Sequence, residues 1–294
     1  MNPENKVVIS AHDAGAANHI LAWLSAGDIV AKNIECFFSG PAAELALQQA
    51  INSSSKVLTE QIKQCDLLIC GTGWMTDTEK CSLELGLQQG KKVVAVFDHW
   101  TNFDKRLLHH GDMLKPSEVW VTDEYAKALA ENLLPELNIV QQENRYLKNL
   151  LKDIRFQESS HHELNILFVM EPVREKYDND DDSPGEFQAF HYLTSQLELL
   201  TDKKVRIIIR PHPSDPADKY RELETERQGI AVAVNTTQSL SEQITDADWV
   251  VGLQSYAMVI ALAAGKRVIS CIPPGGPACI LPHLEIEHLR ELIS

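Results

Sequence analysis

The chain has 294 residues and a formal net charge of −15 at pH 7. This length allows two substantial hydrophobic cores. The negative charge opposes binding to a nucleic-acid backbone or an anionic membrane surface, although a small anion can still bind at a local basic patch.

The six cysteines lie far apart, with no Cys-x-x-Cys pair and no Cys and His spacing typical of structural zinc, so they predict reduced and mostly buried thiols. No apolar run approaches the roughly 18 residues of a membrane span. The N-terminal residues enter a strand pattern at once, without the pattern of a cleavable leader. We therefore expect a cytoplasmic protein without a membrane span.

The first half of the chain alternates between strand and helix patterns. Apolar runs predict strands within residues 6–10, 33–40, 65–73 and 91–100 and again from 118, and amphipathic runs predict helices between them. Gly27, Gly86 and Gly90 stand where such helices can end. Repeated β–α pairing of this kind predicts a parallel sheet covered by helices.

Polar residues follow several of these strands. His12 and Asp13 follow the first, while Asp98, His99 and Trp100 follow the fourth. Ligands collect at the carboxyl ends of parallel strands, so we expect Asp13 to be the catalytic base, with His12 or His99 as the alternative. Asp13 as a plain helix N-cap stays open. A structural Asp–His pair beside a core tryptophan stays open as well.

A polar stretch at 155–163 separates this series from a second one, with strand patterns within 164–172, 203–213, 230–235, 247–255 and 266–274. The near-continuous β-branched run at 205–209 predicts a strand buried on both faces. We expect an α/β fold of two Rossmann-like, doubly wound domains, 1–158 and 159–294, that face each other across a cleft.

The run IIIRPHPSD at 207–215 ends one of these strands in a stiff corner. Pro211 and Pro213 flank His212 and hold its backbone extended at the carboxyl end of the strand. Arg210 can add a charged donor for the same anion. An ordinary strand end with a solvated histidine is the alternative.

A second candidate phosphate site lies in the run VVGLQSYAMVIALAAGK. Gln254 and Ser255 stand between a strand and an apolar helix, where a hydroxyl and exposed backbone amides can bind phosphate, or Ser255 can simply cap the helix. Glu171, after another apolar strand, can bind a ribose hydroxyl or cap a strand end.

Several familiar motifs are absent from the sequence. The dinucleotide fingerprint G-x-G-x-x-G is not met, and GLQQGKK lacks the spacing of a P-loop. The acidic run at 178–182 is typical of a solvated loop. We therefore expect no cofactor and no metal site.

A strand that ends in RPHP, followed about forty residues later by a G-x-x-S-x-A turn and then GKRVIS, resembles the donor-binding domain of GT-B glycosyltransferases. It looks most like the bacterial sialyltransferase, Kdo-transferase and capsule polysaccharide group. The resemblance implies that His212, Pro213 and Ser255 hold the phosphate of a CMP-sugar. HDAG at 12–15 stands in for the group's acidic-acidic-Gly motif and implies Asp13 as the base.

The sequence thus predicts a metal-independent glycosyltransferase of surface polysaccharide synthesis. It would move a sugar from a nucleotide donor, with a CMP-linked acidic sugar as the expected donor, to a saccharide or lipid-linked acceptor. The alternatives are a nucleotide-sugar 2-epimerase or hydrolase on the same fold, and a non-catalytic sugar-phosphate binding protein. A homo-oligomer is compatible with the sequence, which does not define the sugar, the nucleotide or the linkage.

Overall fold

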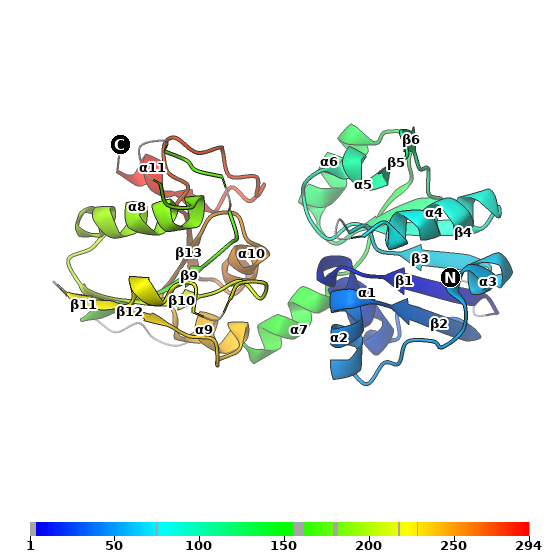
Figure 1. Cartoon of the computed structure of the whole chain (residues 1–294), viewed down its shortest axis with the longest axis horizontal. Coiled ribbons are helices and arrows are strands. Elements are labelled where there is room, and N and C mark those ends of the chain that lie inside the picture. The colour runs from blue at the N-terminus through cyan, green and yellow to red at the C-terminus, as the bar shows by residue number, and fades with distance from the viewer. Residues whose placement is uncertain are drawn as a thin grey trace. The chain divides into compact units, whose positions relative to one another are not determined.

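The structure, a computed structural model, describes residues 4–73, 76–155, 162–173, 175–178, 182–216, 218–227 and 229–293. Contacts divide the chain into two units, residues 1–149 (unit 1) and 150–294 (unit 2), each built around one large sheet (Figure 1). The division falls within helix α7 (Arg145–Asp153). The expected linker at 155–163 lies largely outside the described residues.

The sheet of unit 1 is parallel throughout, in the strand order β2-β1-β3-β4-β7-β8. Its strands are β1 (Lys6–Ala11), β2 (Asn33–Phe38), β3 (Leu67–Cys70), β4 (Lys92–Val96), β7 (Glu118–Val121) and β8 (Ile139–Gln141). The chain first adds β2 on one side of β1 and then crosses to β3 on the other. The strand order therefore reverses between β1 and β3, and crevices for ligands form at such a point.

The helices of unit 1 are α1 (Ala14–Ala26), α2 (Gly40–Gln48), α3 (Leu58–Gln64), α4 (Thr78–Gln88), α5 (Phe103–Leu107) and α6 (Glu124–Leu133), with a small hairpin of β5 (Leu108–His109) and β6 (Asp112–Met113). Ile9 of β1 packs in one core with Ile20 and Trp23 of α1. As predicted, α1 ends at Gly27, whose φ of 74° is left-handed.

The prediction that a helix ends at Gly86 is wrong, because this residue lies inside α4. A side chain there would press on Leu68 of β3 and Val93 of β4, with its Cβ 2.9 Å from each. Gly86 therefore lets α4 lie close to the sheet. Gly90, with a φ of 62°, follows the helix instead.

The sheet of unit 2 has the strand order β11-β12-β10-β9-β13-β14-β15. Its strands are β9 (Glu163–Val169), β10 (Lys204–Arg210), β11 (Thr225–Arg227), β12 (Ile230–Val234), β13 (Trp249–Gly252), β14 (Arg267–Ser270) and β15 (Glu287–His288). Only the edge strand β11 is antiparallel to its neighbour. The parallel strands follow the order 3-2-1-4-5-6, as in a Rossmann fold, with the reversal between β9 and β13.

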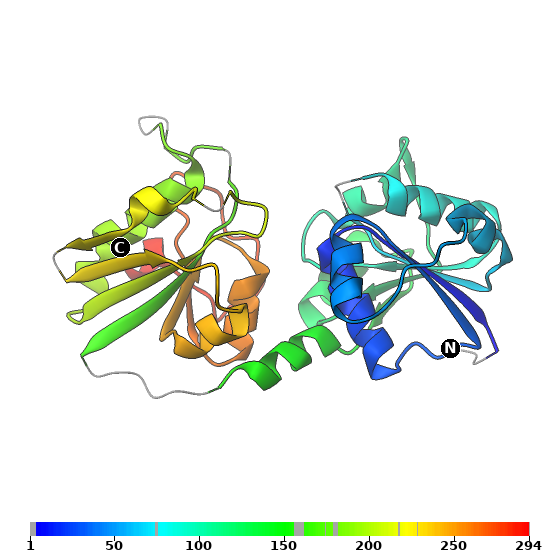
Figure 2. The same ribbon diagram turned by 60° about the horizontal axis from the view of Figure 1, so that its bottom comes forward.

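The helices of unit 2 are α8 (Gly185–Leu200), the 3₁₀ turn η1 (Arg221–Leu223), α9 (Leu240–Asp246), α10 (Tyr256–Ala263) and α11 (Leu289–Leu292). Phe190 of α8 packs with Phe168 of β9 and Ile207 of β10 in the core on one face of the sheet. In Figures 1 and 2, α9 and α10 lie on the other face from α8. Both units are therefore Rossmann-like, which confirms the predicted α/β fold class.

Strand β10 departs from the prediction of burial on both faces. Val205, Ile207 and Ile209 are buried, whereas Arg206 is exposed and Ile208 is half-buried. The physical reason is the short α9, whose seven residues cover only part of that face. In the described part of the chain, no helix is long and apolar enough to cross a membrane.

Candidate functional site

The predicted phosphate-binding residues of unit 2 follow three adjacent strands at one edge of the sheet. His212 follows β10, Glu171 follows β9, and Gln254 and Ser255 follow β13. Strand β9 lies between the other two, so β10 and β13 are about 10 Å apart, which is two interstrand spacings. The edge that carries these residues includes the point where the strand order reverses.

Both polar side chains of the turn from β13 to α10 are already hydrogen-bonded within the protein. Ser255 is the N-cap of α10, and its hydroxyl accepts a hydrogen bond from the Ala257 N–H at 3.2 Å. The Gln254 side-chain oxygen accepts from the Ile280 N–H at 3.4 Å. The cap that the sequence left open is thus present at Ser255, on a helix end whose backbone amides favour an anion.

Glu171 supplies an anion to that turn. Its Oε1 accepts a hydrogen bond from the Gln254 N–H at 2.6 Å. Burial raises the pKa of Glu171 to about 7, while hydrogen bonds from the backbone N–H groups of Gln254, Leu253 and Ser255 limit the rise. The carboxylate therefore lies on the amides that we expected to hold a phosphate.

The corner at His212 is held by hydrogen bonds within the loop. The His212 N–H donates to Asp215 Oδ2 at 3.0 Å, and Nδ1 of its ring accepts from the Ser214 N–H at 3.2 Å. A backbone N–H can only donate, so the neutral ring carries its proton on Nε2. Partial desolvation of the ring lowers the pKa of His212, although the residue as a whole is exposed, and this favours the neutral ring at pH 7. His212 and Pro213 are exposed, so Nε2–H is a donor for a ligand.

Asp215 organises this corner, and the sequence reasoning missed it. Its carboxylate accepts from the Tyr220 hydroxyl at 2.8 Å and from Lys219 Nζ at 2.9 Å, and Lys219 also bonds to Glu186 at 2.7 Å. The available signal was an aspartate directly after the Pro-Ser pair, since aspartate commonly bonds to the backbone of a turn.

Arg210 ends β10, but its Nη1 donates to the Gln238 carbonyl at 3.1 Å and to Gln243 Oε1 at 2.6 Å. Gln238 lies in the connection from β12 to α9, and Gln243 lies in α9 itself. This guanidinium nitrogen is therefore used on the α9 side of the sheet edge.

In unit 1, a buried carboxylate joins the two strand ends at the reversal point. Glu79 of α4 accepts from the His12 N–H at 3.0 Å and from the Gly73 N–H at 2.5 Å, and its side chain is fully buried. Burial raises its pKa, against these two hydrogen bonds. Sequence reasoning missed Glu79, because a single glutamate in the first turn of a helix gives no sign of burial.

His12 and Asp13 form a pair at the same edge. Nδ1 of His12 lies 2.9 Å from Asp13 Oδ1, and the two side chains are 15% and 17% exposed. Asp13 occupies the N-cap position of α1, yet its side chain makes no capping bond. An ionised carboxylate only accepts, so Nδ1 donates and Nε2 of the neutral ring keeps a lone pair. This geometry makes His12 a proton acceptor oriented by Asp13.

The residues after β4 form a structural cluster around a buried arginine. Asp98 Oδ1 lies 2.5 Å from Nη1 of Arg106, whose side chain is 3% exposed. His99 packs edge-on against Trp100 at 5.1 Å, and Trp100 donates to the Asp123 carboxylate at 3.0 Å. Burial lowers the pKa of His99. Asp98 is thus paired with Arg106 and not, as in the structural alternative, with His99, and Trp100 is buried.

Glycines bring these carboxylates close to the backbone. A Cβ on Gly15 would overlap the Asp98 carboxylate, and a Cβ on Gly73 would overlap the carboxylates of Asp13 and Glu79. Three acidic side chains thus surround the start of α1, where the helix dipole stabilises negative charge.

No protein-family model matches the chain, and no curated protein matches it. Solved structures do match over most of its length. The S. aureus protein MnaA in complex with UDP is 10% identical, with 90% of this chain and 78% of that chain covered and a TM-score of 0.60. UDP-GlcNAc 2-epimerase from Neisseria meningitidis, bound to UDP-GlcNAc, is 12% identical over 90% and 82%, with a TM-score of 0.53. MurG from Acinetobacter baumannii is 10% identical over 92% and 79%, with a TM-score of 0.54.

The chain has a GT-B-like fold. Its structural neighbours include glycosyltransferases and sugar-nucleotide epimerases, which confirms the broader part of the predicted resemblance. At these identities the likeness shows the fold alone, so the special resemblance to the sialyltransferase group stays a prediction.

Two observations on this GT-B-like chain concern the predicted absence of a metal site. In the described ranges, no three His, Cys, Asp or Glu side chains are grouped so that they could hold a metal ion. Most of the acidic run at 178–182 lies outside the described residues.

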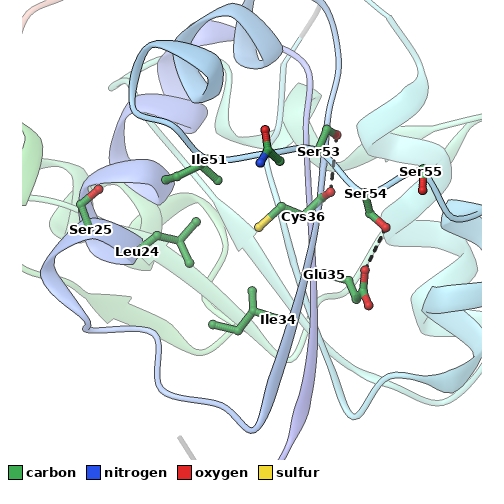
Figure 3. A pocket seen from close by; sticks show the side chains of 10 residues that line it. Leu24, Ser25, Ile34, Glu35, Cys36, Ile51, Ser53, Ser54 and Ser55 are labelled. Carbon is green, nitrogen blue, oxygen red and sulfur yellow. Dashed lines mark hydrogen bonds between the residues drawn. The ribbon is translucent and has the colours of Figure 1, made fainter.

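A pocket of about 630 Å³ lies in unit 1 beside strand β2 (Figure 3). Part of its polar lining is bonded within the protein, because Ser53 accepts from the Phe38 N–H at 2.8 Å and Ser54 donates to Glu35 at 2.8 Å. Leu24, Ile34 and Ile51 supply apolar surface. None of the predicted site residues lines this pocket.

Proposed function

We propose that the chain is a cytoplasmic enzyme that binds a nucleotide sugar through unit 2 and transfers its sugar to a saccharide or lipid-linked acceptor in surface polysaccharide synthesis. The observation that carries this proposal is the edge of the unit 2 sheet, where the His212 ring and the amide-rich turn before α10 flank the reversal of strand order. Neutral N–H donors and a helix N-terminus suit the phosphate of a nucleotide.

Two groups of this chain would act on the reaction. The acceptor hydroxyl loses its proton to Nε2 of His12, which Asp13 orients, as its oxygen bonds to the anomeric carbon. The bond from that carbon to the phosphate oxygen breaks, and the nucleotide leaves with the electron pair. The donor at His212 stabilises the charge that develops on the phosphate.

Two observations bear on which nucleotide the protein binds. The RPHP motif favours a CMP-linked acidic sugar through its resemblance to the sialyltransferase group. Neighbours solved with UDP and with UDP-GlcNAc favour a uridine diphosphate sugar. A nucleotide-sugar 2-epimerase is the second candidate function, because an epimerase bound to UDP-GlcNAc shares this fold.

The test is product analysis by mass spectrometry and NMR. The purified protein is incubated with UDP-GlcNAc or CMP-N-acetylneuraminate, each with and without a pool of saccharide and lipid-linked acceptors. Glycosylated acceptor supports transfer, and an epimer formed without acceptor supports the second candidate. His12→Gln should lose turnover and keep nucleotide affinity, whereas His110→Gln, an exposed control in unit 1, should keep both. The proposal is refuted if no product forms and no nucleotide binds at millimolar concentration.

A further inference from the structure

The turn before α10 is already occupied by a side chain from a distant part of the chain. Glu171 and Gln254 are 83 residues apart, yet Glu171 Oε1 lies 2.6 Å from the Gln254 nitrogen. The amides of Leu253 and Ser255 also stabilise this carboxylate. A backbone N–H that donates at this distance to one anion is not free to donate to another.

The other groups around Glu171 are neutral at pH 7. Tyr177 faces it from the segment after β9, Cys271 from the end of β14, and Cys279 from the segment that follows β14. Burial, and then the charge of Glu171, raises the pKa of Tyr177 to about 12 and raises the pKa of both cysteine thiols.

Among the described residues, no lysine or arginine contributes to the pKa of Glu171. The backbone amides of the turn are therefore what stabilises its charge. A carboxylate in this environment that loses its amides is left buried with no compensating partner, which strongly favours the protonated form.

Building on the function proposed above, we propose that the phosphate of the nucleotide binds the turn before α10 by displacing Glu171, and that Glu171 takes up one proton as it releases these amides. The proton removes the repulsion between the carboxylate and the incoming phosphate. The pKa of about 7 in the free protein means that this proton is available near neutral pH.

The inference predicts how nucleotide affinity changes with pH. If only the protonated form binds, the apparent Kd equals the intrinsic Kd divided by the protonated fraction. With a pKa of about 7, the apparent Kd should rise about tenfold between pH 6 and pH 8. His212 contributes little above pH 7, because its pKa lies below 6.5.

Isothermal titration calorimetry with UDP-GlcNAc tests this inference. Each phosphorus of this ligand carries one strongly acidic oxygen, so the ligand itself does not titrate between pH 6 and 8. Titrations at pH 7.5 in two buffers of different ionisation enthalpy count the protons taken up. We expect about three quarters of a proton, because about a quarter of Glu171 is already protonated in the free protein at this pH. Titrations from pH 6 to 8.5 give the change in Kd.

Two variants separate Glu171 from the other titrating groups. Glu171→Gln cannot ionise, so its affinity should be independent of pH from 7 to 8.5 and should exceed that of the wild type at pH 8. Glu175→Gln, an exposed neighbour in the same segment, should keep the wild-type pH dependence. If Glu171→Gln does not fold, the proton count on the wild-type protein decides alone.

The outcomes distinguish this inference from the function on which it rests. Binding to the wild type without proton uptake, or an unchanged pH dependence in Glu171→Gln, would overturn the inference and leave nucleotide binding intact. No binding of UDP-GlcNAc or CMP-N-acetylneuraminate to either protein at any pH would overturn both.

Discussion

Replacing Asp215 with asparagine should loosen the His212 corner and destabilise unit 2. The wild-type carboxylate accepts from the His212 N–H, the Tyr220 hydroxyl and Lys219 Nζ, and its side chain is 3% exposed. Asparagine keeps the size and one acceptor oxygen, but it removes the charge and turns an NH₂ group toward donors.

The magnitude follows from these contacts. A hydrogen bond to a charged group contributes about 1.5–3 kcal/mol, and loss of one partner from a buried ion pair costs about 3–5 kcal/mol. Lys219 keeps Glu186 as its second partner, so we take about 2–3 kcal/mol. For a unit of this size, that loss lowers Tm by roughly 4–12 °C.

The assay is differential scanning calorimetry together with hydrogen exchange of the peptide that contains His212, whose amide should exchange faster in the variant. Asp218→Asn is the matched control, since Asp218 is exposed on the same loop. A Tm for Asp215→Asn within about 1 °C of this control would refute the reasoning, because the loss predicted above exceeds that difference.

The pH dependence of this variant has a defined sign. Burial works against the charge of Asp215, but hydrogen bonds from Lys219, Tyr220 and the His212 N–H outweigh it and hold the pKa below its ordinary value of 3.8. A lowered carboxyl pKa stabilises the folded state above the unfolded pKa, and this contribution is lost as pH falls through the folded pKa. The difference in stability between wild type and variant should therefore shrink below about pH 3.8.

Three further substitutions test the site. His212→Ala should weaken nucleotide binding about ten- to a hundredfold, with Tm nearly unchanged because the ring bond that is lost, from the Ser214 N–H, is exposed; calorimetry that shows a clearly lower Tm and intact affinity would contradict this. Asp13→Asn should lower kcat by about 10²–10⁴ with nucleotide affinity intact, and full activity would rule out the pair with His12. The raised pKa of Glu171 destabilises the wild type as pH rises from 4.5 through about 7, so melting curves at pH 5 and 8.5 should show Glu171→Gln gaining relative stability at the higher pH.

The sequence was most informative where a residue's role depends on its neighbours in the chain. The strand within 203–213, the Pro-flanked His212 and the Ser255 cap all follow from local patterns. In the structure the strand covers Lys204–Arg210, and His212 and Ser255 each follow the end of a strand. The two-part α/β organisation followed from the alternation of strand and helix patterns.

The carboxylates that join separate strand ends could not be predicted in this way. Glu79 bonds to the His12 amide 67 residues away, and Glu171 bonds to the Gln254 amide 83 residues away. Such partners are defined only when strand order is known, and strand order depends on crossovers that periodicity does not reveal. Gly86 shows the same limit, because its role is contact with β3 and β4 rather than a helix end.

The contact between Glu171 and the turn before α10 also bears on which anions the protein accepts. A carboxylate tethered to the same fold competes with free anions at an effective concentration that for short linkers is already on the order of millimolar and rises when the geometry is fixed. Inorganic phosphate or sulfate would have to displace this internal anion by its contact with the turn alone. A whole nucleotide sugar brings additional binding energy from its base and its sugar, which can displace Glu171. Glu171 thus increases the selectivity of the turn for the complete nucleotide sugar over small anions.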